Sequence, residues 1–329
     1  MAKVSVIIAV YNAEAYVEKC VESLLGQTLQ EIEIIAINDG STDSSEKILA
    51  GFAAKSVKFK YYTIVNGGAA KARNFGLTLA TGEYVGYVDS DDFVDPEMYK
   101  LMYDKAAENS CDIVECNLHH TYDGGEDTEV MERYYTPGEL ICFGRYVVWN
   151  KIYRREFLIE AEANFPASLI YEDVSFVAKL VPYIKKYDYI SEAPVHYVQR
   201  QNSVNNSKSV KTMDIFTVLD DISVFYKKKG FYDQYKNELE YLYARILLCS
   251  SFKRMCRIPD KTLRNKALRL NYRKLTDNYK NWKKNPVLKS ENSRNAFFMK
   301  MQSPFIYKLS CLIFPVLLRV KKQIGPDWR

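Results

Sequence analysis

Residues 82–95 read GEYVGYVDSDDFVD, in which the apolar run YVGYV (84–88) stops abruptly at DSDD (89–92) and Pro96 follows. A short β-prone run without polar alternation is typical of a strand buried on both faces of a parallel sheet. Such sheets bind ligands beyond the carboxyl ends of their strands. Three carboxylates there repel one another unless a cation joins them, and oxygen ligands suit Mg²⁺ or Mn²⁺. The stretch predicts either a metal site that also holds a diphosphate, or a solvated acidic turn before the next helix.

Composition indicates a folded protein with room for two domains. The chain has 329 residues, of which 47% are hydrophobic and 14% aromatic. Its net charge of +5 hides an asymmetry, since residues 1–225 hold 21 Lys/Arg against 34 Asp/Glu and residues 226–329 hold 25 against 7. We therefore expect an acidic body followed by a basic region.

Cysteine and histidine usage argues against a zinc site or a disulfide framework. The seven cysteines form no CxxC pair, and only three histidines are present. This pattern favours a reducing, cytoplasmic compartment. The N-terminus, MAKVSVIIAVYN, lacks a basic segment followed by a long apolar one, so we expect no signal peptide.

Three further buried strands are expected before residues 84–88, at Val4–Val10, Ile32–Ile37 and Phe59–Val65, with helical patterns between them. This alternation predicts an α/β fold with a parallel sheet and helices on both faces. Each strand ends in a polar loop, and all these ends meet at one sheet edge, which is the main argument for a site there. GxGxxG and GxxxxGK[ST] are absent, which disfavours dinucleotide and P-loop sites.

The remaining sequence predicts the end of this domain and a helical region. We expect a hairpin or loop at Tyr122–Glu132, a strand followed by a helix in Val147–Leu158, and two short strands at Tyr187–Ile190 and Val195–Gln199. From Lys211 onward the pattern is helical. The expected domains are therefore 1–210, which is catalytic, and 211–329, which is helical and basic.

Six segments in order resemble the family 2 glycosyltransferases of the GT-A fold: VSVIIAVYNAEAYVEKCVESLLGQT, IEIIAINDGSTDSS, NGGAAKARNFGL, GEYVGYVDSDDFVDPEMY, VWNKIYRREFL and YEDVSFVAKL. They cover roughly residues 3–205, and NDGSTD, ARNxG, DSDD and ED together are specific. The resemblance is to bacterial enzymes that build capsule, exopolysaccharide or wall teichoic acid. It implies a GT-A (Rossmann-like, mostly parallel) domain that transfers a sugar with inversion, with the help of a divalent metal (Mn²⁺ or Mg²⁺). The donor it implies is a nucleotide-sugar, most often a UDP-sugar, and the acceptor a hydroxyl of a glycan or polyprenyl-linked molecule.

The resemblance also implies nucleotide-binding residues. Val10 and Tyr11 match positions beside the base, where an aromatic face contributes roughly 1–3 kcal/mol. Asp39 matches an aspartate that accepts a hydrogen bond from uracil or ribose, and Asn66 matches a base-contacting position. Asp89 is expected at the ribose.

Metal and diphosphate contacts are expected from neighbouring positions. The resemblance assigns the metal to Asp91. Arg73 lies one turn into a helix, and guanidinium groups and helix N-termini both favour a diphosphate. Lys71 is a second candidate cation or a solvated side chain. For Asp92 we favour a structural role, either orienting Arg73 or capping the following helix.

In Glu172-Asp173 the resemblance implies that the aspartate is the general base, which removes the acceptor hydroxyl proton. A positioned base contributes about 10²–10⁴-fold. Because the two acids are adjacent at a helix start, only one points easily at the acceptor; a plain helix cap is the alternative. His196 is expected to be either a metal ligand or a structural residue.

Five further residues complete the candidate site. Arg200 and Ser203, with Gln199, are expected to close over the diphosphate. The QxxRW motif is absent in that form, which disfavours processive polymerisation. Trp149 and Lys151 are candidates for an acceptor pocket, with ordinary core packing an equal alternative for Trp149.

The basic C-terminal region has two open interpretations. Residues 251–300 hold fifteen Lys/Arg and three acids, yet no nucleic-acid-binding module is present, so we expect no nucleic acid partner. The apolar segment Ser303–Val320 is interrupted by Lys308 and Pro315, which suits an interfacial helix on an anionic membrane. The alternative is packing on its own domain or on a second copy in a homo-oligomer. The first interpretation places the protein in the cytoplasm, peripheral to the inner membrane face.

Two other functions compete with glycosyl transfer. A nucleotidyltransferase usually carries a Gly-rich basic loop after its first strand, whereas this chain has Tyr11-Asn12-Ala13-Glu14. A catalytically silent protein of the same fold, binding a sugar nucleotide or acting as a scaffold, is the alternative from a different class. The complete set of candidate site aspartates and Arg73 argues against it.

Overall fold

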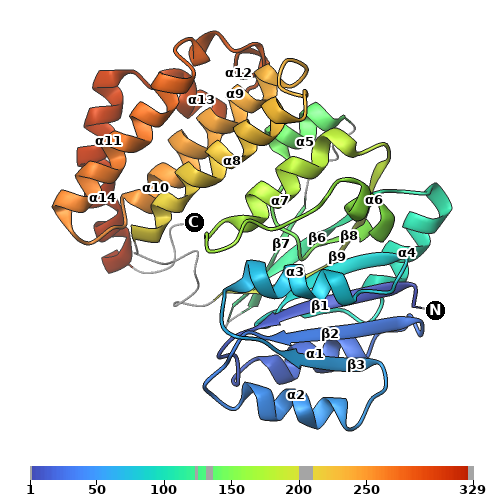
Figure 1. Ribbon diagram of the computed structural model, residues 1–329. Helices are drawn as coiled ribbons and strands as arrows, with labels where there is room; N and C mark the ends of the chain where they lie inside the picture. The colour runs from blue at the N-terminus through green and yellow to red at the C-terminus, as the bar shows by residue number, and fades with distance from the viewer. Residues whose placement is uncertain (1, 123–124, 131–135, 200–209, 325–329) are drawn as a thin grey trace. The chain divides into compact units, whose positions relative to one another are not determined.

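The computed structural model describes residues 2–122, 125–130, 136–199 and 210–324. The chain forms two compact units (Figure 1). Unit 1 consists of Met1–Leu140 and Arg145–Arg200, and unit 2 of Ile141–Gly144 and Gln201–Arg329. Unit 1 contains a mixed sheet with helices, and unit 2 is helical, so the predicted succession of an α/β fold and a helical region is confirmed.

A nine-stranded sheet organises unit 1, with the order β3-β2-β1-β4-β8-β6-β9-β5 and β7 paired to β6. The strands are β1 Val4–Val10, β2 Ile32–Asn38, β3 Phe59–Thr63, β4 Tyr84–Asp89, β5 Phe93–Val94, β6 Ile113–Tyr122, β7 Gly125–Glu129, β8 Lys151–Arg154 and β9 Tyr187–Val198. The first four pair in parallel, as their continuous apolar sequences predict. Their carboxyl ends therefore lie along one edge of the sheet.

Helices cover both faces of this parallel half. The helices around the sheet are α1 Val17–Leu25, α2 Ser45–Ala53, α3 Ala69–Leu79, α4 Met98–Asn109, α6 Arg155–Glu160 and α7 Glu172–Leu180, and the boundary between the units falls within α5 Pro137–Phe143. Figure 1 shows α3 on one face of the sheet and α1 and α2 on the other. Alternate side chains of β1 therefore face different helices. Val6 and Ile8 belong to the core cluster that includes Val17 and Val21 of α1, while Ile7 meets α3.

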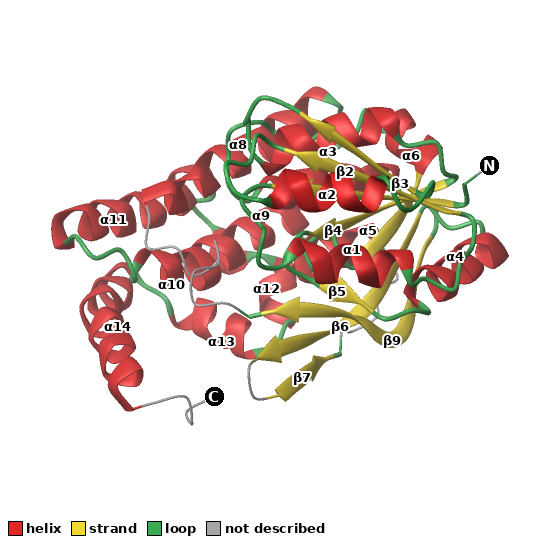
Figure 2. Ribbon diagram, turned by 90° about the horizontal axis from the view of Figure 1, so that it is seen from below, coloured by secondary structure: helices red, strands yellow, loops and turns green. Residues whose placement is uncertain are grey.

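The second half of the sheet is mixed. β8 is antiparallel to both β4 and β6. β6 runs parallel to β9, and the two strands lie side by side in Figure 2. The hairpin expected near Tyr122 is present as β6 and β7. The expectation of two short strands after Tyr187 is wrong: one strand, β9, runs through Val198, and a register shift opposite Cys116 and Leu118 accommodates its polar middle.

Unit 2 is built from helices that share one buried core. They are α8 Asp214–Lys228, α9 Lys236–Arg245, α10 Phe252–Met255, α11 Lys261–Asn278, α12 Pro286–Ser290, α13 Arg294–Met301 and α14 Pro304–Ile324, with a π-helical turn at Ile246–Ser251. Asn271, fully buried, donates to the Leu247 carbonyl at 2.6 Å and to the Tyr307 hydroxyl at 3.1 Å, which joins α11 to its neighbours. Side-chain caps fix three helix starts, because Asp260, Asn285 and Ser293 each accept a backbone N–H three residues on.

The close approach of α3 to β1 and β2 requires a glycine. A Cβ on Gly76 would lie 2.5 Å from Ile7 Cγ2 and 3.4 Å from Ile37 Cγ1, so the ARNFG segment seats its helix directly on the sheet. Residues Ala72 and Ala70 of the same helix are also small and buried. The helix that carries Arg73 is thus held against the strand ends.

We expect Gly76→Ala to lower the free energy of unfolding by about 1–3 kcal/mol, because the added methyl group overpacks this contact. The matched control is Gly51→Ala on α2, where a Cβ meets nothing within 4 Å and the change should stabilise the helix by up to about 1 kcal/mol. Urea unfolding of both variants measures the difference. Equal midpoints for the two variants would contradict the packing argument.

Candidate active site

The loops after β1 and β2 are locked together by side-chain hydrogen bonds. Asn12, with φ of 46°, accepts from the Thr42 backbone N–H at 2.8 Å and donates its own N–H to Ser41 Oγ at 3.1 Å. The Ala13 N–H donates to Ser45 Oγ at 2.9 Å. At this junction Val10 is buried, and Tyr11 is 52% exposed. An exposed aromatic ring on a fixed loop has the form of a stacking surface.

Asp39 joins the loop after β2 to the start of α3. Its two carboxylate oxygens accept the backbone N–H groups of Gly67 at 2.8 Å and Gly68 at 2.7 Å, and Asp39 itself is 2% exposed. The Asn66 amide donates to the Asp39 carbonyl at 2.9 Å. Both residues therefore shape the loop, and their expected contacts with a base or ribose stay predictions.

Arg73 bridges two motifs that are distant in the sequence. Its Nη2 lies 2.7 Å from Asp89 Oδ1 and its Nη1 lies 2.6 Å from Glu172 Oε1. The guanidinium carbon lies 5.5 Å from the centre of the Phe165 ring, and only 8% of the side chain is exposed. The DSDD turn after β4 and the start of α7 are thereby held in one site.

Charge explains why a buried guanidinium is tolerated. Burial opposes the charged form, but the carboxylates of Asp89 and Glu172 outweigh it and raise the pKa of Arg73 above its ordinary value. Arg73 thus remains a cation at any physiological pH. In this structure its ends hold carboxylates, so a direct contact with a diphosphate stays a prediction.

Asp173 lies next to this bridge at the beginning of α7. Burial and the neighbouring charge of Glu172 raise the pKa of Asp173 to about 7, against a smaller opposing effect of Arg73. Its Oδ1 accepts the Val174 N–H at 2.9 Å. A carboxylate with a pKa near neutrality is suited to accept and return a proton. Glu172 is engaged by Arg73, which leaves Asp173 as the candidate base of the pair.

The three aspartates of DSDD form a compact group. One oxygen each of Asp89, Asp91 and Asp92 lies within 4.8 Å of the others. An all-oxygen donor set of this kind fits a hard divalent cation such as Mg²⁺ or Mn²⁺. Asp92 Oδ2 is buried and has no hydrogen-bond partner among the described residues, which also fits a group that acquires a partner on ion binding.

Asp92 differs from its expected role. It neither contacts Arg73 nor caps α4; its Oδ1 accepts the Val198 N–H at 2.8 Å and so ties the DSDD turn to β9. Burial, with a smaller contribution from the charge of Asp89, raises the pKa of Asp92 well above its ordinary value. The aspartate turn is therefore coupled to the strand that ends just before residue 200.

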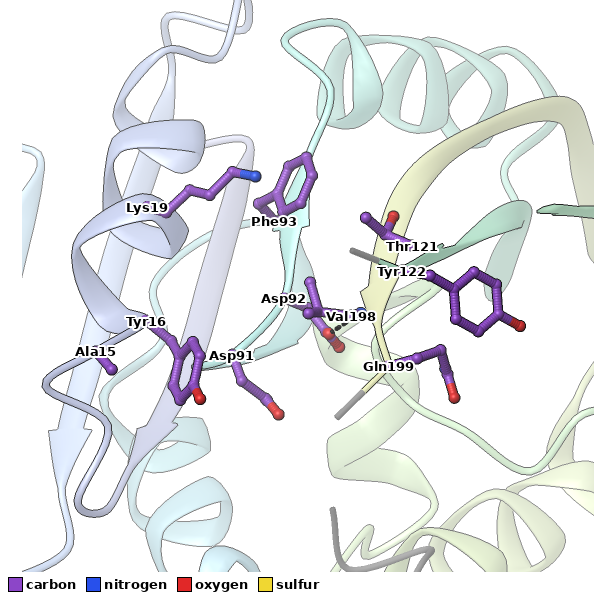
Figure 3. Close-up of a pocket in the computed structure, with 10 residues that line it drawn as sticks. All are labelled: Ala15, Tyr16, Lys19, Asp91, Asp92, Phe93, Thr121, Tyr122, Val198 and Gln199. Atoms are coloured by element: carbon purple, nitrogen blue, oxygen red, sulfur yellow. Dashed lines mark hydrogen bonds between the residues drawn. The ribbon is translucent and has the colours of Figure 1, made fainter. Parts of the chain in front are cut away.

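A cavity of about 160 Å³ adjoins the aspartates. Figure 3 shows its lining: Ala15, Tyr16, Lys19, Asp91, Asp92, Phe93, Thr121, Tyr122, Val198 and Gln199. The volume is below the roughly 300–1,000 Å³ of typical ligand pockets, so it suits part of a ligand. The Lys19 ammonium lies 3.3 Å from the centre of the Phe93 ring.

Tyr16 and Lys19 were not predicted as site residues. Tyr16 is 38% exposed and lines the cavity together with Lys19. The sequence could have indicated this, because the two residues are three positions apart. That spacing places them on one side of the helix start, beside the first polar loop.

Of the two alternatives for His196, a metal ligand or a structural residue, the contacts of its ring favour the structural residue. Its Nε2 lies 2.9 Å from Asp95 Oδ1 and its Nδ1 lies 2.8 Å from Glu126 Oε1, so both ring nitrogens already face carboxylates. The ring stacks on Phe93 with centroids 4.3 Å apart. The metal-capable group described above contains Asp89, Asp91 and Asp92 without His196.

Trp149 and Lys151, the candidates for an acceptor pocket, are both buried, and for Trp149 core packing was the stated alternative. Trp149 is 7% exposed and stacks on Tyr197 at 5.1 Å. The Lys151 ammonium, 3.2 Å from Glu115 Oε1, donates to three oxygens of residues 145–150. Burial lowers the pKa of Lys151 while Glu115 opposes that shift. A charged side chain satisfied in this way is unavailable to a ligand.

Three expected residues remain to be placed. Lys71 is exposed and donates to the Val65 carbonyl at 3.1 Å, which agrees with a solvated side chain. Arg200 and Ser203 lie outside the described residues.

We expect Arg73→Met to lower the free energy of unfolding by about 3–5 kcal/mol, because Asp89 and Glu172 lose their shared partner. Lys71→Met, on an exposed position of the same helix, is the matched control and should stay within about 0.5 kcal/mol. Denaturant unfolding at constant pH measures both. An Arg73→Met protein as stable as the parent would contradict the bridging role.

The geometry can now be compared with known proteins. The model of "Glycosyl transferase family 2" matches residues 5–167. The "Uncharacterized glycosyltransferase YibD" of Escherichia coli is 30% identical over 74% of this chain and 78% of its own length. The "Uncharacterized glycosyltransferase EpsJ" of Bacillus subtilis is 31% identical, and the match spans 64% of this chain but only 65% of that relative.

Solved structures agree on the fold. TarS 1–349 of S. aureus, solved in complex with UDP-GlcNAc, has a TM-score of 0.63 at 22% identity and covers 88% of this chain and 92% of its own. The mannosyltransferase PcManGT of Pyrobaculum calidifontis, solved with GDP-Man and Mn²⁺, has a TM-score of 0.55 at 14% identity and covers 97% and 86%. The expected GT-A-like, Rossmann-type domain is thus confirmed, and the chain belongs to glycosyltransferase family 2.

Proposed function

We infer that this protein transfers a sugar, with inversion and with the help of a divalent cation, from a nucleotide-sugar to a hydroxyl of a glycan or lipid-linked acceptor. A UDP-sugar is the proposed donor, since the similar TarS structures contain UDP-GlcNAc or UDP. PcManGT contains GDP-Man, so both UDP- and GDP-sugars have to be tested as donors. Cell-surface polysaccharide synthesis is the proposed setting, because relatives include a poly(ribitol-phosphate) beta-glucosyltransferase.

One observation carries the proposal: Arg73 contacts both Asp89 and Glu172 at 2.6–2.7 Å. The DSDD turn is the proposed donor side of the site, and Asp173, adjacent to Glu172, is the proposed acceptor side. Direct displacement requires both sides within one site, with the base opposite the leaving diphosphate. The contacts of Arg73 hold the proposed donor side next to the proposed acceptor side, as a displacement without a covalent intermediate requires.

The proposed roles follow from position. Tyr11 stacks on the base, and the Asp39–Asn66 loop and Asp89 orient base and ribose. Asp91, with Asp89 and Asp92 beside it, holds the cation. When bound, a divalent cation neutralises charge on the departing diphosphate. Asp173 removes the proton of the attacking hydroxyl, and its pKa of about 7 lets it exist in both protonation states near neutral pH.

We expect donor hydrolysis and sugar transfer to stop on chelation with EDTA and to return with Mn²⁺ or Mg²⁺. Asp91→Ala should lower kcat/KM by about 10²-fold or more, because the loss of the cation removes several kcal/mol of transition-state stabilisation. Release of nucleoside diphosphate from a panel of UDP- and GDP-sugars is the measurement.

Asp104→Ala is the matched control for this experiment. Asp104 pairs with Lys100 on α4 and its side chain is 56% exposed, so this variant should keep full metal-dependent turnover. Turnover that is unaffected by EDTA and by Asp91→Ala would refute metal dependence, and no turnover with any donor would favour a silent binding protein.

We expect Asp173→Asn to lower transfer by about 10²–10⁴-fold while binding of the nucleotide is kept, because the amide cannot accept the proton. In the parent, kcat/KM should rise with pH and level off above a pKa near 7, where Asp173 is ionised. Glu156→Gln, on α6 with a 75% exposed side chain, should leave rate and profile unchanged.

Stability supplies a second readout for the same residue. The folded-state pKa of Asp173 is raised, so the carboxyl group destabilises the fold as pH rises from about 4 through 7. Asp173→Asn should therefore raise the Tm at pH 8 and have little effect at pH 4. Retained transfer, or a lower Tm at pH 8, would contradict the assignment.

A further inference from the structure

Helix α14 is apolar on two opposite faces, and only one of them is covered by unit 2. On the inner face, Tyr307 is 5% exposed and its hydroxyl donates to the Leu268 carbonyl at 3.0 Å. Phe314 packs against Phe252 with ring centroids 5.5 Å apart. A helix that is apolar on both sides normally has both sides buried. The outer face of α14 therefore lacks the packing partner that such a helix usually has.

The exposed apolar side chains of α14 recur at helical spacing. Phe305 is 75% exposed and Leu312 is 66% exposed. Together with α13, the exposed apolar side chains are Phe297, Met301, Phe305, Leu309, Leu312, Ile313, Val316 and Leu317. Eight exposed large apolar side chains on two consecutive helices are more than scattered surface residues, and they indicate an interaction site. We name these eight side chains the α13–α14 patch.

The positive charge of the C-terminal residues indicates which partner would cover the patch. Residues 304–324 contain four Lys/Arg and no acid, and residues 226–329 hold 25 Lys/Arg against 7 Asp/Glu. A second copy of this chain would bring the same excess of positive charge to the contact. An anionic lipid surface offers both an apolar layer for the patch and the opposite charge for its surroundings.

Length and shape favour a position in the interface. Among the described residues, no single helix is long and apolar enough to cross a membrane; α13 and α14 satisfy that test only as a pair bent by 118°. Ala296 and Met299 of α13 are fully buried, and Tyr307 on the inner face of α14 is 5% exposed. Crossing a bilayer would pull these side chains out of their core, whereas shallow insertion leaves them in place.

We propose that the α13–α14 patch docks unit 2 on an anionic membrane surface, with the outer face of α14 inserted at the level of the headgroups. This inference concerns location and does not rest on the proposed sugar transfer. It also gives a physical reason for the excess of Lys and Arg in residues 226–329.

The test is flotation of the full chain with vesicles of phosphatidylcholine alone or with 30% phosphatidylglycerol, at low and high salt. We expect binding to the anionic vesicles at low salt, a marked loss at high salt, and at least tenfold weaker binding by Leu312→Ser/Val316→Ser. The matched control, Val224→Ser/Leu270→Ser, changes exposed apolar side chains of α8 and α11 and should bind like the parent.

Two further readouts keep the test decisive. Circular dichroism checks folding, and the single change Phe305→Ser, at the most exposed patch position, should weaken binding about threefold if the double variant unfolds. Donor hydrolysis should be the same in parent and patch variants, which separates this proposal from the catalytic one. Absent binding, equal binding to neutral vesicles, or patch-dependent self-association without vesicle binding would each overturn the proposal.

Discussion

The paired contacts of Arg73 are the constraint on which the proposed site depends. Asp89 follows a strand of the parallel sheet and Glu172 begins a helix 83 positions later, so only a third group can fix their separation. A planar guanidinium holds its donors in a fixed geometry, so Nη1 and Nη2 of Arg73 each meet one carboxylate. The favourable charge pairing compensates for burying the arginine, and the cost of separating the partners keeps the two motifs together.

The parallel half of the fold could be read from the sequence because its strands are short, apolar and separated by helices. Val4–Val10 and Tyr84–Asp89 are buried on both faces, and continuous apolar runs report that environment directly. β9 could not be read in the same way. The segment between Ile190 and Val195 is polar and contains Pro194, which resembles a break, and only the register shift against β6 keeps the strand continuous.

For the site, local sequence identified the acidic and basic groups but not their partners. Lys151 was a candidate for an acceptor pocket, yet Glu115, distant in the chain, lies beside its ammonium group in the core. For His196 the sequence left two alternatives open, because its carboxylate neighbours, Asp95 and Glu126, come from two other parts of the chain. Long-range pairing of charges is a property of the folded arrangement, so no window of sequence contains it.

The carboxylate of Asp39 has a consequence for how a nucleotide would be received. By accepting the N–H groups of Gly67 and Gly68, it occupies donors at the entrance to α3 that a bound anion could otherwise use. The glycine loop is therefore ordered before any ligand arrives. This loop loses its conformational entropy when the chain folds and not when a ligand binds. A nucleotide would therefore meet a preorganised surface and keep more of its interaction energy as affinity.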